Sequence, residues 1–330
     1  MERENLYRYV GNSAQLYGVR RVILDEGNAR GICIYEVTTA GGLNFDVLAD
    51  TGLDLGSLKF CGVNINYMTK NGYDSPARFL PIPDNFDHTF PGGMLYTCGL
   101  LSVGPECKDI EGDGEFHPLH GRFHGNSARN LSAYTDDKNI YISGEILETE
   151  QWKHALSVKR KYIIPVYGSE ILLEDEITNL TPNPVEYEML YHVNFGYPFL
   201  NEKTKLTLPE NKKVTPRTDY AAAGIKDQCK FIKPIDNEPE RVYFNEIYSE
   251  PVAKIYNDEL KINISLEWSL NTLPRLSQWK SMRSGEYVLG LEPSTCYTMG
   301  RAEERKSGEL RILKGFDSIK NYVKLKFEKV

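Results

Sequence analysis

The sequence lacks the long apolar runs and the cysteine patterns that mark membrane-spanning and disulfide-stabilised proteins. Nowhere do apolar residues continue for the roughly 20 positions that a bilayer-spanning helix needs. Residues 1–5 are charged, and no apolar stretch of signal-peptide length follows them. The six cysteines form no Cys-x-x-Cys pair, which favours reduced and mostly buried thiols. These absences predict a soluble, cytoplasmic protein without a membrane partner.

Basic patches and the common catalytic motifs are also missing. The formal net charge is -7 at pH 7, and lysine and arginine are scattered along the chain, so nucleic acid is not an expected partner. The sequence contains no Gly-x-Ser-x-Gly elbow, P-loop, Gly-x-Gly-x-x-Gly or His-Glu-x-x-His. The usual hydrolase, nucleotide-binding and zincin functions are therefore excluded.

What the sequence does contain is period-two alternation, punctuated by 27 glycines and 17 prolines. In residues 43–49, Leu43, Phe45 and Val47 share one face while Asn44 and Asp46 share the other. Similar patterns predict strands over residues 140–147, 156–164, 171–177, 185–195, 260–268, 287–291 and 322–327, with a turn at residues 181–184. Helical periodicity is scarce. We therefore predict an all-β fold, a large antiparallel β-sandwich formed by a single domain over residues 1–330.

The longest stretch without alternation covers residues 74–125 and holds four of the six histidines. Long irregular segments over a rigid scaffold usually line a functional site. Within it, His120 and His124 tempt a metal interpretation, but on an extended strand they would lie about 13 Å apart, too far to share one ion. We therefore expect no metal. Arg122 fits a contact to a carboxylate or a substrate oxygen, or an ordinary surface ion pair.

His192 lies in the strand predicted from residue 185, on the face that also carries Glu186, Glu188 and Asn194. A carboxylate near an imidazole favours the protonated ring, which suits a general acid. The alternative is a surface histidine on a solvated face of the sheet.

Glu292 ends another predicted strand, on the same face as Gly290, which leaves room for something to approach. Pro293 holds Glu292 in an extended conformation. The alternative is an ordinary carboxylate at the end of a strand. Trp279 offers an aromatic surface on which a pyranose ring can stack, with core packing as its alternative.

These motifs together resemble the aldose 1-epimerase (galactose mutarotase) superfamily, and more closely its divergent branch known as the DUF4432 family. The resemblance covers roughly residues 15 to 327. It rests on short motifs in a fixed order: Asp50-Thr51-Gly52-Leu53-Asp54-Leu55, Cys98-Gly99-Leu100, His120-Gly121-Arg122, the His192 strand, Gln278-Trp279-Lys280, Gly290-Leu291-Glu292-Pro293 and Gly300-Arg301.

The resemblance implies a β-supersandwich with an open cleft, and it assigns roles by position. His192 matches the histidine that protonates the ring oxygen of a pyranose, Glu292 the carboxylate that deprotonates the anomeric hydroxyl, and His120 the histidine that orients the sugar. The asparagine–arginine pair and the acidic sugar-gripping residue of mutarotases have no clear counterpart, with Arg78 a weak candidate for the arginine. The residues expected to contact substrate are His120, Arg122, Trp279, Lys280, Arg301, Asn194 and Arg78.

Anomer interconversion needs one acid and one base but no cofactor, because the C1–O5 bond opens when O5 gains a proton while the C1 hydroxyl loses one. The expected partner is a small-molecule sugar. The sequence is also compatible with a homodimer. Two other classes remain: a carbohydrate-binding protein without turnover, and a lyase or epimerase for an acidic or phosphorylated sugar. Arg122, Lys280, Arg283 and Arg301 favour the anionic substrate.

Overall fold

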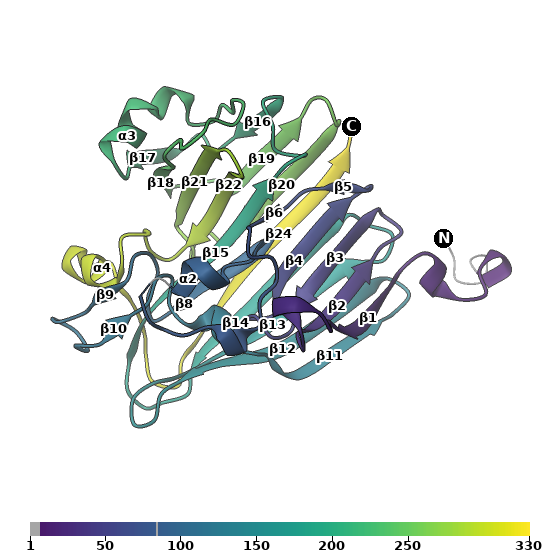
Figure 1. Cartoon of the computed structure of the whole chain (residues 1–330). Coiled ribbons are helices and arrows are strands. Elements are labelled where there is room, and N and C mark those ends of the chain that lie inside the picture. Colours follow the sequence, from purple (N-terminus) through teal and green to yellow (C-terminus); the bar gives the residue numbers. More distant parts are fainter. Residues whose placement is uncertain (1–6, 84) are drawn as a thin grey trace.

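Three antiparallel β-sheets of eight, seven and five strands form the body of the protein (Figure 1). The computed structural model describes residues 7–83 and 85–330. The all-β prediction is confirmed. Two further pairs of short strands lie outside the large sheets, β6 (Tyr67–Met68) with β7 (Gly92–Gly93) and β9 (Cys107–Lys108) with β10 (Phe116–His117).

The five-stranded sheet is a simple meander near the start of the chain. Its strands are β1 (Gly18–Ile23), β2 (Cys33–Thr38), β3 (Leu43–Leu48), β4 (Asp54–Phe60) and β5 (Val63–Asn64). The eight-stranded sheet has, in spatial order, β11 (Arg129–Thr135), β12 (Asn139–Thr149), β13 (Ala155–Pro165), β14 (Glu170–Asn179), β24 (Ser318–Lys329), β20 (Ile262–Trp268), β19 (Val252–Asn257) and β16 (Thr204–Thr207).

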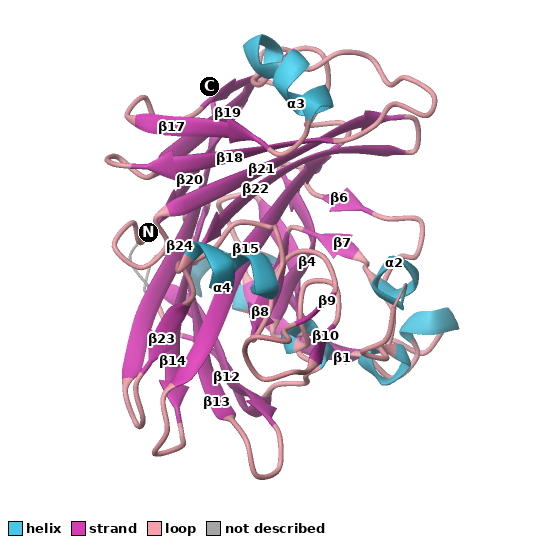
Figure 2. Cartoon of the chain, turned by 90° about the vertical axis from the view of Figure 1, so that its left-hand side faces the viewer, coloured by secondary structure: helices cyan, strands magenta, loops and turns pink. Residues whose placement is uncertain are grey.

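The seven-stranded sheet carries the candidate site. Figure 2 shows several of its strands side by side, and their spatial order is β17 (Lys212–Pro216), β18 (Arg241–Ile247), β21 (Arg275–Arg283), β22 (Glu286–Ser294), β15 (Val185–Gly196) and β23 (Arg311–Leu313). The seventh strand, β8 (Leu95–Leu100), pairs with residues 188–193 of β15.

Alternating burial explains which strands the sequence revealed. Strand β12 buries every second residue, as do β14 and β20, because one face of the eight-stranded sheet meets the core. The main core is a large cluster with contributions from all three sheets, such as Phe45, Val158 and Leu289, and two smaller apolar clusters lie beside it in the described part of the chain. At its centre Arg160 of β13 donates to Asp175 at 2.9 and 2.8 Å and also binds Asp54 of β4.

The eight predicted strands all exist, with ends shifted by at most four residues, and the predicted turn at residues 181–184 separates β14 from β15. The prediction of an irregular segment over residues 74–125 is partly wrong. It contains β8, whose six residues are all buried and therefore show no alternation. Among the described residues, the helices are short: η1 (Ser13–Gln15), η2 (Gly27–Ala29), η3 (Pro76–Arg78), α2 (Asn85–Thr89), η4 (Phe123–Gly125), α3 (Asp219–Ala223), η5 (Ile225–Asp227) and α4 (Arg301–Ser307).

No helix in the part of the chain that the structure describes is long and apolar enough to cross a membrane.

Candidate active site

His192 and Glu292 meet because they are neighbours on adjacent antiparallel strands. The register of β15 and β22 pairs Leu190 with Ser294 and Val193 with Leu291, so His192 stands opposite Glu292. Further residues on the neighbouring strands stand in the same cross-strand row as His192 and Glu292. His192 pairs with Tyr96 of β8, and Glu292 pairs with Ser277 of β21.

The two candidate catalytic side chains are buried, with only 5% of His192 and 2% of Glu292 exposed. His192 Nε2 lies 3.2 Å from Glu292 Oε1. These two atoms are close but not aligned for a hydrogen bond, and Glu292 Oε1 has no hydrogen-bond partner among the described residues. The other ring nitrogen, His192 Nδ1, has none either. The pair is therefore poised for contact with a further molecule.

Burial changes the protonation expected for this pair. It lowers the pKa of His192 to about 4 and raises the pKa of Glu292 to about 8, because a dry site disfavours the charged form of each. Around neutral pH the imidazole is neutral and Glu292 holds the proton. The expectation that the strand carboxylates favour a protonated ring is therefore wrong, because burial dominates the pKa of His192. Glu186 binds Arg301 and Arg305 instead, and Glu188 accepts from Val103 N at 2.8 Å.

His120 reaches the same pocket from the turn between β10 and η4. Its backbone has a φ of 60°, in the left-handed region, so the local turn must be held by its surroundings. The N–H of His120 donates to Gly104 O at 2.9 Å, and its carbonyl accepts from Gly99 N at 3.1 Å. Gly104 N approaches Nδ1 at 3.4 Å, which favours a proton on Nε2. Burial, with His192 nearby, holds the pKa of His120 well below its usual value.

Two buried glutamates fix the segment of residues 99–104 against which His120 rests. Glu148 Oε2 accepts from Leu100 N at 2.9 Å, and Glu188 Oε2 accepts from Val103 N at 2.8 Å. Burial raises the pKa of Glu148 to about 7 and that of Glu188 to about 8. Both side chains therefore belong to the support of the site, although only Glu188 lies on the His192 strand.

An aromatic wall closes the pocket on the side of α2. Phe86 and Phe90 stack with ring centroids 4.9 Å apart, Phe86 lies 5.2 Å from the His120 ring, and Phe90 lies 6.0 Å from the His192 ring. Trp279 packs edge-on against His192 at 5.3 Å. The pocket measures about 340 Å³, within the range of small-molecule sites. It is lined by Phe86, Asp87, Phe90, Gly104, Pro105, Leu119, His120, His192, Arg217, Glu240, Val242, Trp279, Glu292 and Thr298.

Arg217 and Glu240 belong to the pocket but escaped the sequence analysis. Glu240 forms an ion pair with Arg217 and accepts from Trp279 Nε1 at 2.6 Å, so these three side chains form one unit. Arg217 and Glu240 supply an arginine and a carboxylate to the pocket. Both lie far in the sequence from Arg78, the weak candidate for the arginine. Arg217 directly follows β17, and Glu240 directly precedes β18, so both lie in connections between strands, where no alternation marks them.

The residues predicted to contact substrate separate into two groups. His120 and Trp279 line the pocket with His192 and Glu292, whereas the other five do not line it. Arg122 is exposed and borders a different hollow on the far side of the His120 turn. Asn194 is buried and donates to Gly93 O at 3.2 Å and to His192 O at 3.1 Å. Arg78 pairs with Asp74 at 2.9 Å.

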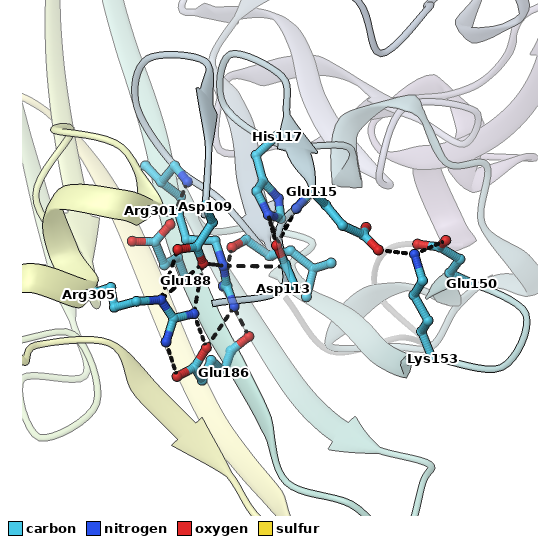
Figure 3. Close-up of polar contacts among 12 residues, drawn as sticks. Asp109, Asp113, Glu115, His117, Glu150, Lys153, Glu186, Glu188, Arg301 and Arg305 are labelled. Carbon is cyan, nitrogen blue, oxygen red and sulfur yellow. Dashed lines mark hydrogen bonds and ion pairs between the residues drawn. The ribbon is translucent and has the colours of Figure 1, made fainter. Parts of the chain in front are cut away.

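Lys280 and Arg301 are buried away from the pocket. Lys280 lies on the opposite face of β21 from Trp279, where its ammonium donates to Asp227 O at 2.8 Å and to Lys230 O. Arg301 joins the network of Figure 3, in which Arg301 and Arg305 of α4 bind Asp109 and Glu186. Both cations are therefore satisfied by protein groups.

The same network bears on metal binding. Asp109, Asp113 and His117 bring ligand atoms within 4.8 Å of one another, the one such group among residues 7–83 and 85–330. Asp109 is already held by two guanidinium groups, whose positive charge opposes a bound cation (Figure 3). His124 is buried against Tyr96 and Phe79, and Phe86 contacts the rings of both His124 and His120.

Comparisons with known proteins bear on the fold. The structure is similar to that of a putative aldose 1-epimerase from Klebsiella pneumoniae, with a TM-score of 0.88, 23% identity, and coverage of 96% of this chain and 86% of that one. A galactose mutarotase-like protein from Clostridium acetobutylicum gives 0.68 at 14% identity, covering 96% and 100%. Galactose 1-epimerase from Lactobacillus acidophilus gives 0.64 at 13% identity, covering 95% and 99%.

These likenesses establish the fold, the galactose mutarotase-like β-sandwich. No curated protein matches the sequence. The family described as "Domain of unknown function (DUF4432)" matches residues 29–327. The chain belongs to the DUF4432 family.

Proposed function

We propose that this protein is an aldose 1-epimerase that interconverts the two anomers of a free sugar. The observation that carries the proposal is the buried pair of His192 Nε2 and Glu292 Oε1, 3.2 Å apart in a pocket of sugar size that His120 also lines. The fold shared with galactose 1-epimerase from Lactobacillus acidophilus supports it.

The protonation of the pair suits the chemistry. Between the pKa of His192, about 4, and that of Glu292, about 8, the two groups together hold one proton. One partner is then an acid and the other a base at any moment. In the resting site Glu292 holds the proton, and the short distance to His192 allows the alternative arrangement, imidazolium with carboxylate, once a sugar fills the pocket.

Ring opening then needs two proton transfers. The acid of the pair protonates O5 while the base removes the proton from the C1 hydroxyl, so that the C1–O5 bond breaks and C1=O1 forms. After rotation about C1–C2, the O5 hydroxyl attacks the other face of the aldehyde, and the two groups exchange roles. In this proposal, His120 and the Arg217–Glu240–Trp279 unit, which line the same pocket, hold the sugar hydroxyls and the ring face.

The charges of the pocket favour a neutral sugar over an acidic or phosphorylated one. Arg217 is the one lysine or arginine that lines the pocket in the described part of the chain, and it already pairs with Glu240. Of the four cations that favoured an anionic substrate in the sequence, Arg122, Lys280 and Arg301 do not line this pocket. Arg283 borders a neighbouring groove.

The direct test measures anomer exchange by NMR saturation transfer over a panel of neutral, acidic and phosphorylated aldoses. We expect acceleration for at least one neutral sugar, and loss of about 10²-fold or more in His192→Asn and in Glu292→Gln, because general acid–base catalysis supplies about 10²–10⁴-fold. The double variant should be little slower than either single one, since the two groups act as a unit.

Matched controls are His154→Asn and Glu174→Gln, two residues that do not line the pocket. Both should exchange sugars at the wild-type rate. Calorimetry should show that His192→Asn and Glu292→Gln still bind the sugar. Exchange that is unchanged in either single variant would refute the assigned roles. Tight binding by wild-type protein without any exchange would indicate a sugar-binding protein instead.

A further inference from the structure

The active-site pocket borders a second groove. This groove measures about 600 Å³, and four of its lining residues also line the pocket: Asp87, Phe90, Glu240 and Trp279. Its other lining residues are Tyr67, Thr69, Lys70, Asn71, Glu238, Pro239, Ser281, Arg283 and Glu286. Because the two hollows share these residues, they lie side by side, and a ligand in the pocket is within reach of the groove.

The register of β21 and β22 explains why the groove starts at the catalytic pair. Four cross-strand pairs share one face of the sheet and follow one another outward: Ser277 with Glu292, Trp279 with Gly290, Ser281 with Val288, and Arg283 with Glu286. The first pair lies at the pocket and the last borders the groove. Six residues of extended strand span about 20 Å, which is longer than one pyranose ring.

Trp279 sits between the two hollows. On one side its ring lies 5.3 Å from His192, and on the other it packs edge-on against Tyr67 of β6 with centroids 6.2 Å apart. Its Nε1 is held by Glu240 at 2.6 Å, so the indole is fixed in place. A fixed aromatic ring at the junction of two sites suits a carbohydrate, whose successive rings present apolar faces.

Hydrogen bonds also hold the opposite wall of the groove in a fixed position. Asn71 donates its side-chain amide to Asp87 O at 2.9 Å and to Phe90 O at 3.1 Å, and Thr69 Oγ1 donates to Phe90 O at 2.6 Å. These bonds fasten α2 and Phe90 to the turn after β6. The groove therefore has a fixed width between this turn and β21.

The charges in the groove largely cancel. Glu286 binds Lys70 at 2.8 Å and Arg283 at 3.4 Å. Glu238 binds Arg241 at 2.9 Å, and Glu240 pairs with Arg217. Paired side chains of both signs offer donors and acceptors for hydroxyl groups, but no concentrated positive charge for a phosphate.

From these features we infer that the groove holds a second sugar unit, so that the substrate class is a reducing disaccharide or a longer reducing saccharide. This inference rests on the proposed function, because the anomeric hydroxyl must be free and lie at His192 and Glu292. The second unit is then attached through another carbon of the reducing ring and lies over Trp279 toward Arg283 and Glu286.

The test compares kcat/KM for anomer exchange of several reducing disaccharides, with different linkages, against that of the monosaccharide at their reducing end. At least one disaccharide should exceed its monosaccharide by about tenfold, the equivalent of 1.4 kcal/mol of added binding. Ser281→Trp, which fills the groove but not the pocket, should bring the disaccharide down to the monosaccharide value. The monosaccharide itself should change by less than about twofold.

Ser281 is only 5% exposed, so a tryptophan at this position could prevent folding. A second variant at an exposed position therefore tests the inference independently. Arg283→Ala removes a side chain that is 46% exposed and should lower kcat/KM for the disaccharide alone, by about fivefold. Disaccharides that never exceed their monosaccharides would overturn the inference, as would equal losses for both sugars in these variants. So would a preference for a phosphorylated monosaccharide that depends on Arg283.

Failure of the proposed function gives a different result, since no sugar would then be anomerised at all. In that case calorimetry decides the question of the groove. A disaccharide that binds wild-type protein more tightly than its monosaccharide, and loses this advantage in Ser281→Trp, supports the second sugar site. Equal affinities refute it.

Discussion

The active-site pocket and the network around α4 place similar residue types in opposite electrostatic states. Around α4, Arg301 and Arg305 each bind both Asp109 and Glu186, and Arg305 and Arg301 hold the pKa of Asp109 below its usual value. In the pocket, His192 and Glu292 are also buried. Burial raises the pKa of Glu292 by more than the nearby guanidinium of Arg217 lowers it, and burial lowers the pKa of His192.

The difference teaches what each region is for. Ion pairs with several hydrogen bonds per charge hold segments together, and the α4 network fastens helix α4 to β15 and to Asp109, which directly follows β9 (Figure 3). A neutral pair with unpartnered atoms stabilises nothing by itself. Instead, the pair keeps one proton available for transfer, as acid–base catalysis in a buried pocket requires.

The largest effect on stability is expected in the paired region. Arg301→Met leaves the buried carboxylate of Asp109 with one guanidinium fewer and also removes the donor to Leu101 O. The free energy of unfolding should fall by about 3 kcal/mol. Urea denaturation measures this, with Arg20→Met as the control, because the exposed pair of Arg20 and Glu36 should contribute less than about 1 kcal/mol. Equal losses would show that the α4 network is not special.

In the pocket, the corresponding effect is on activity rather than stability. A Cβ added at Gly290 would lie 2.7 Å from Glu292 Oε1 and 3.1 Å from His192 Cε1. Gly290→Ala should displace the carboxyl group and lower kcat/KM by about 10- to 100-fold, because a shift of about 1 Å in a catalytic group is that costly. Gly18→Ala is the control, since nothing lies within 4 Å of its added Cβ. Undiminished exchange in Gly290→Ala would contradict the geometry of the pair.

The sequence predicted the paired strands better than the network or the pocket walls. His192 and Glu292 were found because alternation along their strands separated them from the core, and the strand register then placed them opposite each other. The prediction that Glu186 favours a protonated His192 failed, because alternation assigns a side chain to a face of the sheet but does not tell which loop covers that face. Here the loop of Asp109 and helix α4 cover it with arginines.

Arg217, Glu240 and Phe86 could not be predicted for a related reason. They lie in connections whose positions depend on how distant strands pack, and no period in the sequence encodes that. Arg122, Lys280 and Arg301 show the converse error. Lys280 follows Trp279 on β21, where neighbouring side chains point to opposite faces, whereas Arg122 directly precedes η4 and Arg301 begins α4, so both lie outside the strands.

The pH dependence of activity tests the shared proton directly. Below about pH 4 both groups of the pair are protonated and no base remains, and above about pH 8 both are deprotonated and no acid remains. The value of kcat/KM, which reports the free enzyme, should therefore be flat between these limits and fall about tenfold per pH unit outside them. A limb near pH 6.5 would show instead that His192 behaves as a solvated histidine.

The last expected effect is a change in how stability depends on pH. The folded protein raises the pKa of Glu292 from 4.5 to about 8, so between these values the folded state holds a proton that the unfolded state has lost. Stability must then fall as pH rises through this window, by about 1 kcal/mol per pH unit from this group. Glu292→Gln cannot ionise and should lose this slope, becoming more stable relative to wild type from pH 5 to pH 8. Urea denaturation at several pH values measures the difference between the two proteins. Glu174→Gln, an exposed carboxylate, should follow wild type throughout. Parallel curves for Glu292→Gln and wild type would mean that Glu292 is ionised in the folded protein, and the pocket would then resemble the charged network around α4 rather than contrast with it.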